Sequence, residues 1–285
     1  MLSEEAATIR NTTMSSLLAL YTSDPFLVRC ELERVSPHVS LASADDVAGV
    51  GAYDDGLVLL RRFGAQAPKA DLWHAPESDV VLAHAQPLAP GLPPEENTQP
   101  FRFRQWLFAA SGRLEKPEAL RERLLERLPD FLQRVVKGGL PEEAVFGAFL
   151  ARLRELGRTE DLSLEAPVAA QVLLHTARTV EDAAREAGVA QRPGFTLAAT
   201  NGRVLVAARR GGAPLFLRLL EGEATCERCG LGSAAKDSDT LVRQHRQRRS
   251  VVLATHPLKP GAWSEVEDGA AVAVDRKLSL QTLKG

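Results

Sequence analysis

The residues best suited to chemistry by type and spacing are two of the chain's three cysteines, Cys226 and Cys229, which are separated by two positions. Such a pair is half of a tetrahedral zinc site, and His245 or His256 could complete it. A complete site usually needs a second pair at short spacing, and the sequence has none. A redox function would need a thioredoxin-like βαβ context, which the order of elements does not provide. The sequence therefore predicts no metal, no redox function and no cofactor.

A compact basic run, RQHRQRR at residues 243–249, is the second candidate, as a contact for phosphate or nucleic acid. No aromatic residues interleave with it, and the formal net charge of the whole chain is -2. We interpret the run as a solvated helix face or linker and expect no nucleic-acid partner. The chain has no Walker A, dinucleotide-binding or nucleophile-elbow motif, so nucleotide and α/β-hydrolase functions are not supported.

A third set of residues forms a pattern by order and spacing. Residues 14–20 read MSSLLAL, 84–86 HAQ, 97–101 NTQPF and 106–112 WLFAASG. This order resembles the class II glutamine amidotransferases, which are N-terminal-nucleophile hydrolases. There the corresponding segments read Met-Cys-Arg-Leu-Leu-Ala, His-x-Arg, Asn-Thr-His-Pro-Phe and Trp-x-Phe-Ala-His-Asn-Gly. Weaker matches extend the similarity to residue 275, and the residues that differ are the reactive ones.

The resemblance implies that Ser15 occupies the position of the family's nucleophile. In the family this residue is an N-terminal Cys, whose free α-amine acts as the base. Ser is a weaker nucleophile with a far higher pKa, and the nitrogen of Ser15 in the printed sequence is a peptide amide. Translation from Met14, followed by removal of the methionine, would expose Ser15. The alternative, which we favour, is that Ser15 merely opens a core strand and that residues 1–13 extend a domain of residues 14–285.

The resemblance also assigns substrate contacts and an oxyanion hole. The family's Arg, which holds the substrate carboxylate in a bidentate pair, is replaced by Gln86, whereas His84 is retained. The family's Asn-Gly oxyanion hole becomes Ser111 and Gly112, of which Gly112 can still donate its backbone N–H.

The anchor for the substrate's α-amino group is also changed. The position of the family's Asp falls on Pro141, and Glu142 could replace it only with a shift along the chain. Four departures at four functional positions predict that glutaminase activity is lost and that the protein acts as a binding or scaffolding subunit. The main alternative is an active N-terminal-serine amidase that hydrolyses a glutamine-like or γ-glutamyl amide through Ser15. The third is an ammonia-donating subunit for a synthetase. We expect a protein partner and leave a homodimer open.

The elements that must position these residues follow from periodicity. Strands are expected at residues 17–20, 26–32, 47–53, 56–63, 80–85, 104–110, 195–199, 204–208, 215–219, 251–254 and 271–274. Helices are expected at 116–136, with a kink or break at Pro129, and at 142–156 and 167–187. Strands, then helices, then strands without βαβ alternation indicate an α+β protein. The resemblance implies a four-layer αββα sandwich with two antiparallel sheets between helical layers.

Two further expectations concern disorder and compartment. The polar segment 222–249 shows little periodicity and is predicted to be an insertion or a flexible loop. The chain has no apolar run near the ~20 residues of a membrane helix and no signal peptide in residues 1–13, so we expect a cytoplasmic protein without a membrane partner.

Overall fold

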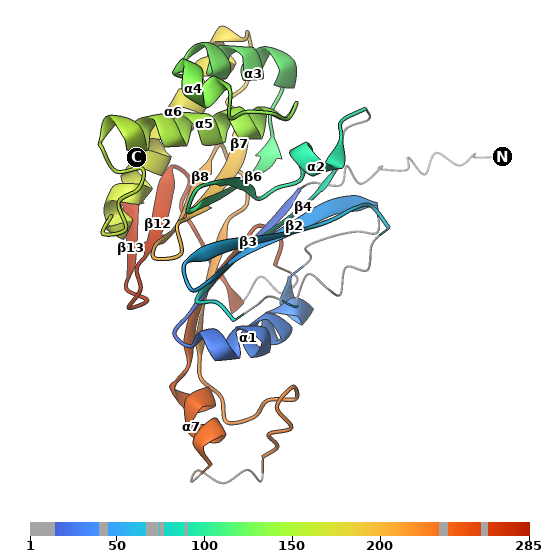
Figure 1. Cartoon of the computed structure of the whole chain (residues 1–285), viewed down its shortest axis with the longest axis vertical. Helices are drawn as coiled ribbons and strands as arrows, with labels where there is room; N and C mark the ends of the chain where they lie inside the picture. The colour runs from blue at the N-terminus through green and yellow to red at the C-terminus, as the bar shows by residue number, and fades with distance from the viewer. Residues whose placement is uncertain are drawn as a thin grey trace, which may run out of the picture.

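The computed structural model describes residues 15–39, 45–66, 74, 77–88, 91–233, 239–257 and 262–285, except for the side chain of His38. The expected N-terminal extension, residues 1–13, lies outside the described residues. Two antiparallel sheets form the centre of the molecule, and helices cover the outer face of each sheet (Figure 1). This arrangement confirms the predicted α+β class and αββα sandwich.

The first sheet has seven strands in the order β11-β9-β10-β1-β4-β2-β3. Its strands are β1 (Ser16–Thr22), β2 (Asp46–Asp54), β3 (Leu57–Phe63), β4 (Val80–Pro87), β9 (Phe216–Glu221), β10 (Arg249–Ala254) and β11 (Ser264–Glu265). β1 lies between β10 and β4, with Leu17 opposite His84 and Leu18 opposite Ala254. All seven residues of β1 are buried, because one face packs on the second sheet and the other on a helix.

The second sheet has six strands in the order β13-β12-β8-β7-β6-β5. Its strands are β5 (Phe101–Phe103), β6 (Trp106–Arg113), β7 (Gly194–Thr200), β8 (Leu205–Arg210), β12 (Ala270–Val274) and β13 (Leu280–Lys284). β7 and β8 form the hairpin predicted around Asn201-Gly202, and Gly202 takes the positive φ of 81° that such a turn requires.

The helices are divided unequally between the two outer faces. The main layer on the six-stranded sheet consists of α3 (Pro117–Glu126), α4 (Asp130–Gln133), α5 (Pro141–Glu155) and α6 (Ala166–Glu186). The seven-stranded sheet is covered by α1 (Val28–Val35). Shorter elements are the 3-10 turns η1 (Pro25–Leu27) and η2 (Ser36–His38), α2 (Pro94–Asn97) and α7 (Thr240–Gln247). As predicted, the chain breaks at Pro129, between α3 and α4.

The strand predicted at residues 26–32 is wrong, because this segment forms η1 and the first part of α1. The side chain of Asp24 accepts a hydrogen bond from the backbone N–H of Phe26 at 3.0 Å, and Pro25 begins the turn. Cap and proline together start a helix, and Val28, Leu32 and Val35 then lie on its buried face. Apolar β-branched residues favoured a strand locally, but the helical spacing of the buried ones decides the structure.

The described parts of segment 222–249, residues 222–233 and 239–249, contain more structure than the composition of the segment indicates. Cys226 and Leu231 form an antiparallel bridge, and α7 begins after Asp239, whose side chain accepts from the N–H of Leu241 at 2.8 Å. The basic run is only partly a solvated face, since Arg248 is buried and its Nε lies 2.6 Å from a carboxylate oxygen of Glu31 in α1. Among the described residues, no helix is both long and apolar enough to cross a bilayer.

Candidate functional site

The site predicted from the sequence lies where the two sheets meet. Ser15 immediately precedes β1 of one sheet, and Ser111 and Gly112 lie near the end of β6 in the other. The hydroxyl of Ser111 donates to the carbonyl oxygen of Ser15 at 2.5 Å, and the two hydroxyl oxygens lie 3.1 Å apart. Because Ser111 has one proton and uses it on the carbonyl, Ser15 is the donor between the hydroxyls. The backbone N–H of Gly112 donates to Oγ of Ser15 at 3.2 Å.

Gly112 is required by the close approach of β7 and by its own backbone conformation. Its φ is +141°, and a Cβ atom at this position would lie 2.4 Å from the carbonyl oxygen of Gly194 and 2.7 Å from Cα of Phe195. Side-chain-bearing residues rarely adopt this conformation. The N–H that faces Ser15 is therefore held in place by a backbone that only glycine fits.

His84 lies in β4, opposite both Leu17 and Gly49 of the neighbouring strands, and its side chain is completely buried. Burial lowers the pKa of His84 to about 3, although the nearby backbone of Ala110 opposes this shift. The imidazole is therefore neutral at physiological pH and faces the interior. His84 thus lies next to the site as a fully buried side chain, and its predicted contact with a substrate stays a prediction.

Both polar atoms of the Gln86 side chain form hydrogen bonds with other residues of the protein. Its amide nitrogen donates to the carbonyl oxygen of Asn97 at 3.0 Å, and its amide oxygen accepts from Nε2 of Gln99 at 2.8 Å. Gln99 in turn pairs with the backbone of Ala110, donating to its oxygen at 3.1 Å and accepting from its N–H at 2.7 Å. A chain of buried amides thus connects β4 to β6.

Gln99 was missed as a site residue, although the NTQPF segment contained the signal. It occupies the histidine position of the family's Asn-Thr-His-Pro-Phe, and it is 1% exposed. Asn97 from the same segment was missed as well. Its side-chain oxygen accepts from the N–H groups of Gly139 and Leu140 at 2.8 and 3.2 Å, and so fixes the loop that leads into α5.

Glu142, at the start of α5, lines a small and mostly apolar cavity together with Ser111 and Gly112. Its Oε2 is buried and has no hydrogen-bond partner within the described part of the chain. Burial raises the pKa of Glu142 to about 7. The carboxyl group is thus close to the predicted oxyanion hole and is about half protonated at pH 7.

The structure brings the predicted residues into one region but leaves them mostly covered. Ser15, Ser111 and Gly112 are in direct contact, and Gln86 is connected to them through the Gln99–Ala110 pair. His84, Gln86 and Ser111 are at most 6% exposed, whereas Ser15 is partly exposed and Gly112 is exposed. The groups that would contact a substrate therefore contact each other.

His256, one of two histidines considered as partners of Cys226 and Cys229, lies beside the start of β1 instead. Its Nδ1 is 2.9 Å from the hydroxyl of Thr255 and 3.4 Å from that of Ser16. The same Thr255 hydroxyl accepts the backbone N–H of Leu17 at 2.9 Å. Burial lowers the pKa of His256. These contacts stabilise the start of β1, the strand that follows Ser15.

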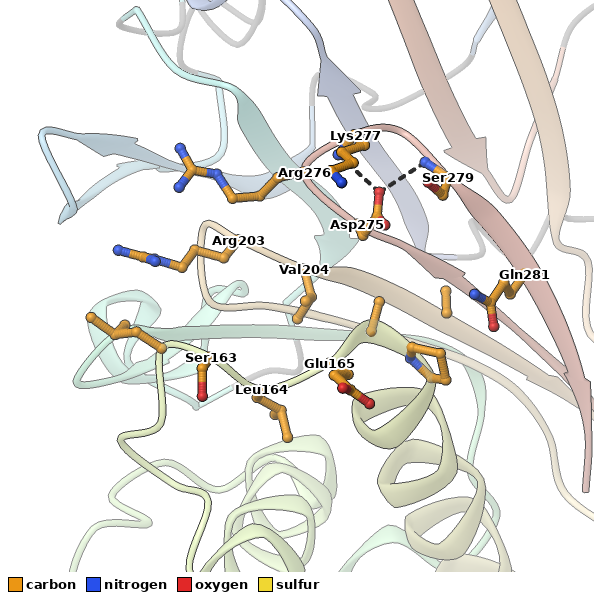
Figure 2. A pocket seen from close by; sticks show the side chains of 14 residues that line it. Ser163, Leu164, Glu165, Arg203, Val204, Asp275, Arg276, Lys277, Ser279 and Gln281 are labelled. Atoms are coloured by element: carbon orange, nitrogen blue, oxygen red, sulfur yellow. Dashed lines mark hydrogen bonds between the residues drawn. The ribbon is translucent and has the colours of Figure 1, made fainter.

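A separate pocket lies at the opposite end of the six-stranded sheet from Ser111, between the start of α6 and the β12–β13 turn (Figure 2). Asp275, in this turn, accepts the backbone N–H groups of Lys277 and Ser279 at 2.8 Å each. Because the Asp275 carboxylate stabilises its own turn, we assign it no place in the candidate site.

Comparison with known proteins agrees with the pattern found in the sequence. Residues 14–282 match the family model described as glutamine amidotransferases class-II. The chain is 22% identical over 217 residues to the Saccharomyces cerevisiae protein named "Probable glutamine amidotransferase DUG3". The match covers 72% of this chain and 59% of that relative, so the chain spans well under two thirds of the yeast protein.

Solved structures show the same fold at low sequence identity. A glutamine aminotransferase class-II domain protein from Silicibacter pomeroyi superposes with a TM-score of 0.59 at 19% identity, covering 94% of this chain and 98% of that one. A predicted glutamine amidotransferase from Pseudomonas aeruginosa gives 0.54 at 17%, covering 96% and 97%. The allosteric regulatory enzyme of purine biosynthesis gives 0.55 at 12%, and the match covers 94% of this chain but 48% of the enzyme.

Proposed function

Because the chain belongs to the class II glutamine amidotransferase family, we propose that it is a glutamine amidotransferase-like protein that has lost glutaminase activity and acts as a binding or scaffolding subunit. One observation carries this proposal: the polar groups at the family's functional positions are hydrogen-bonded to one another. Ser111 and Gly112 contact Ser15, and Gln86 contacts Asn97 and Gln99.

The first step that is weakened is the attack of the Ser15 hydroxyl on the amide of the substrate. The hydroxyl of Ser15 has a far higher pKa than a cysteine thiol, and the nitrogen of Ser15 in the printed sequence is an amide that cannot act as the base. The Ser111 hydroxyl, at the family's oxyanion-donor position, donates to the carbonyl oxygen of Ser15 instead. Losing one oxyanion donor typically lowers the rate by ~10²–10³.

Substrate binding is weakened as well. A carboxylate clamp needs a charged, bidentate donor, and Gln86 is neutral with its amide donating to the carbonyl oxygen of Asn97. Glu142 is the acidic group nearest to the position of the family's amino-group anchor, but burial raises its pKa to about 7, so that only about half of these carboxyl groups carry a charge at pH 7. A neutral carboxyl group attracts a substrate ammonium only weakly.

A second candidate function is an active N-terminal-serine amidase that acts on a glutamine-like or γ-glutamyl amide. The observation that favours it is the 3.2 Å contact between the N–H of Gly112 and Oγ of Ser15, which places a backbone donor next to the nucleophile position. This mechanism also needs the free amine that a chain beginning at Ser15 would have.

The deciding experiment measures ammonia release from glutamine and from γ-glutamyl amides by two forms of the protein, the full chain and a chain that begins at Ser15. We expect no turnover by either form. Ser15→Cys and Gln86→Arg, made singly, should not restore activity, because residues that act as a unit are not additive. Ser264→Ala, at an exposed position, is the matched control for Ser15→Ala. Steady turnover that Ser15→Ala abolishes and Ser264→Ala leaves intact would establish the amidase and overturn the proposal.

A further inference from the structure

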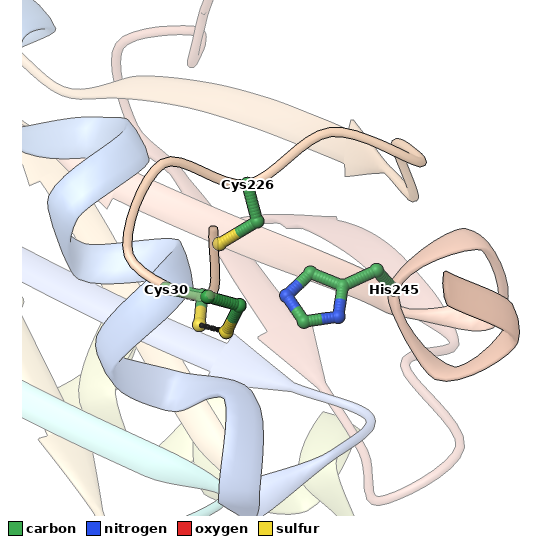
Figure 3. Close-up of side chains that lie close together, drawn as sticks. Cys30, Cys226 and His245 are labelled. Atoms are coloured by element: carbon green, nitrogen blue, oxygen red, sulfur yellow. Dashed lines mark hydrogen bonds between the residues drawn. The ribbon is translucent and has the colours of Figure 1, made fainter. Parts of the chain in front are cut away.

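All three cysteines of the chain lie together with one histidine, at the end of the molecule opposite to helices α3–α6 (Figure 1). Cys30 belongs to α1, Cys226 and Cys229 to the turn after β9, and His245 to α7. Figure 3 shows Cys30, Cys226 and His245 pointing toward a common centre. One sulfur or nitrogen atom from each of the four residues lies within 4.8 Å of those of the other three.

The spacing of the four atoms suits a metal ion better than a disulfide. The sulfur atoms of Cys30 and Cys229 are 3.6 Å apart, whereas a disulfide requires about 2.05 Å. Around a tetrahedral Zn²⁺ with Zn–S bonds of about 2.3 Å, neighbouring sulfur atoms are about 3.8 Å apart. The observed separations therefore need at most about 1 Å of closure to reach this geometry.

His245 provides an independent indication of a ligand. Its ring is completely buried, and Nδ1 lies 2.9 Å from the carbonyl oxygen of Leu241. A carbonyl oxygen only accepts, so Nδ1 carries the proton and Nε2 carries the lone pair. Nε2 is buried and has no hydrogen-bond partner among the described residues. Zinc-binding histidines typically donate their other ring N–H to a carbonyl oxygen in this way.

The turn that carries Cys226 and Cys229 has a backbone that holds both thiols in place. The N–H of Cys226 donates to the carbonyl oxygen of Leu231 at 2.9 Å, and the N–H of Leu231 donates to the carbonyl oxygen of Cys226 at 2.9 Å. Between these two residues, the N–H of Gly230 donates to the backbone carbonyl oxygen of Glu227 at 3.1 Å, and Gly230 has a φ of +67°. The turn is closed by its own backbone bonds, so the two cysteines keep their relative positions.

Ion pairs bring the three segments together around the thiols. Arg228, between the two cysteines of the turn, pairs with Glu33 of α1. Arg248, next to the end of α7, pairs with Glu31 of α1 at 2.6 Å, and both of these side chains are at most 2% exposed. The contacts to α1 thus connect it both to the turn and to the segment that carries His245.

We propose that the thiolates of Cys30, Cys226 and Cys229 and the Nε2 atom of His245 bind one Zn²⁺ ion as a structural site. Four protein ligands leave no open position, which is the arrangement of structural rather than catalytic zinc. Each thiol releases its proton to solvent as a Zn–S bond forms, and no electron is transferred. The ion fixes the turn with Cys226 and Cys229, and α7 with His245, onto α1.

The zinc site is separate from the candidate functional site. Ser15 lies just before the first residue of β1. Cys30 lies in α1, which comes after the last residue of β1, and β1 itself is about 20 Å long. The zinc proposal therefore stands whether or not the protein hydrolyses glutamine.

The test starts with the full chain, expressed in zinc-supplemented medium and purified under reducing conditions without a polyhistidine tag. Elemental analysis should find about one zinc per chain. X-ray absorption on the same sample should show sulfur at about 2.3 Å and nitrogen at about 2.0–2.1 Å from the metal, in a ratio of three to one. Replacement by Co²⁺ should give the intense visible bands of a tetrahedral site with thiolate ligands.

Variants then identify the ligands. Cys30→Ser, Cys229→Ser and His245→Gln should each lose the bound zinc, whereas His175→Gln, on the exposed face of α6, should keep it. Where a variant does not fold, release of zinc from the wild-type chain by thiol modification answers the same question. Three modified thiols per zinc released would support the proposal.

Four results would overturn it. The first is a reduced wild-type chain that takes up no zinc when titrated with the metal. The second is retention of the zinc by Cys226→Ser combined with Cys229→Ser. The third is a Cys30–Cys229 disulfide in the native protein, found by mass spectrometry before reduction. Bound iron in place of zinc would likewise contradict the proposal.

Discussion

At the scale of single residues, the candidate site differs from its family by neutral substitutions that then pair internally. In the family pattern that the sequence resembles, an arginine corresponds to Gln86 and a histidine to Gln99, and the side chains of these two glutamines lie next to each other. The two amides are complementary, since one donates to the other at 2.8 Å. Buried amides with every partner satisfied are stable, whereas an unpaired one costs about 1–3 kcal/mol. Restoring the arginine alone would therefore place an unpaired charge among these amides.

Glu142 gives a prediction at the same scale. Its pKa in the folded protein is about 7, because the carboxyl group is buried, and an unfolded Glu titrates near 4.3. The folded state thus binds more protons between these values, and the free energy of unfolding falls as the pH rises from about 4 to about 7. Over this window Glu142→Gln should gain up to about 3 kcal/mol relative to wild type.

Urea unfolding at a series of pH values measures this effect. The exposed Glu118→Gln is the control, and its unfolding free energy should follow the wild-type pH dependence. A constant difference between wild type and Glu142→Gln from pH 4 to pH 8 would contradict the assignment.

At the scale of elements, patterns that repeat along the chain could be predicted and those that depend on distant contacts could not. The strand around residues 80–85 was predicted from a short apolar run, the helix around 142–156 from apolar residues spaced on one face, and the helix around 167–187 from the proline at its first turn and its apolar first half. The break at Pro129 followed from the missing N–H of proline. α1 was missed because its sequence also suits a strand. α7 was missed because it buries only two residues, Val242 and His245, in an otherwise polar sequence.

In the candidate site too, sequence patterns could be predicted, whereas contacts between distant segments could not. A family pattern indicated which positions to compare, and Ser15, Ser111 and Gly112 lie in contact as that pattern implies. The pairing of Gln86 with Gln99 could not be predicted, because it depends on how closely the NTQPF segment lies against β2. The carbonyl oxygen of Gln99 comes within 2.3 Å of where a Cβ on Gly49 would be. Such a close approach is a property of packing and not of local sequence.

The N-terminal cap of α7 provides the prediction at this scale. Asp239 accepts from the backbone N–H of Leu241 at 2.8 Å, and α7 has only eight residues. Asp239→Ala should weaken the helix by about 1 kcal/mol, whereas Asp239→Asn should preserve it, because Asn caps equally well. Hydrogen exchange of the α7 amides should speed up about fivefold in the Ala variant. Equal exchange in the two variants would show that the cap does not stabilise this helix.

At the scale of the whole molecule, both tyrosines of the chain connect the two sheets. Tyr53 of β2 donates to the carbonyl oxygen of Thr200 at 2.8 Å, and Tyr21 of β1 donates to that of Arg203 at 3.0 Å. Both acceptors lie at the β7–β8 turn of the opposite sheet. Burial raises the pKa of both hydroxyl groups above the ordinary value of about 10.

A titration of tyrosinate absorbance tests this arrangement, because the chain has no other tyrosine. The native protein should show no ionisation near pH 10, and the protein unfolded in urea should ionise there. The neutral form is favoured in the folded state, so the free energy of unfolding should fall as the pH rises above about 10. Ionisation of the native protein near pH 10, with the fold intact by circular dichroism, would contradict the buried geometry.

The strand order also determines when the protein can fold during synthesis. β1, whose seven residues are all apolar or buried, pairs on one side with β4 and on the other with β10, which begins at Arg249. At a translation rate of about 5–20 residues per second, β1 waits roughly ten to thirty seconds after β4 emerges for its second neighbour. During this time the nascent chain carries an open apolar edge on the ribosome. Efficient production of this protein should therefore depend on chaperones that shield that edge until β10 has been made.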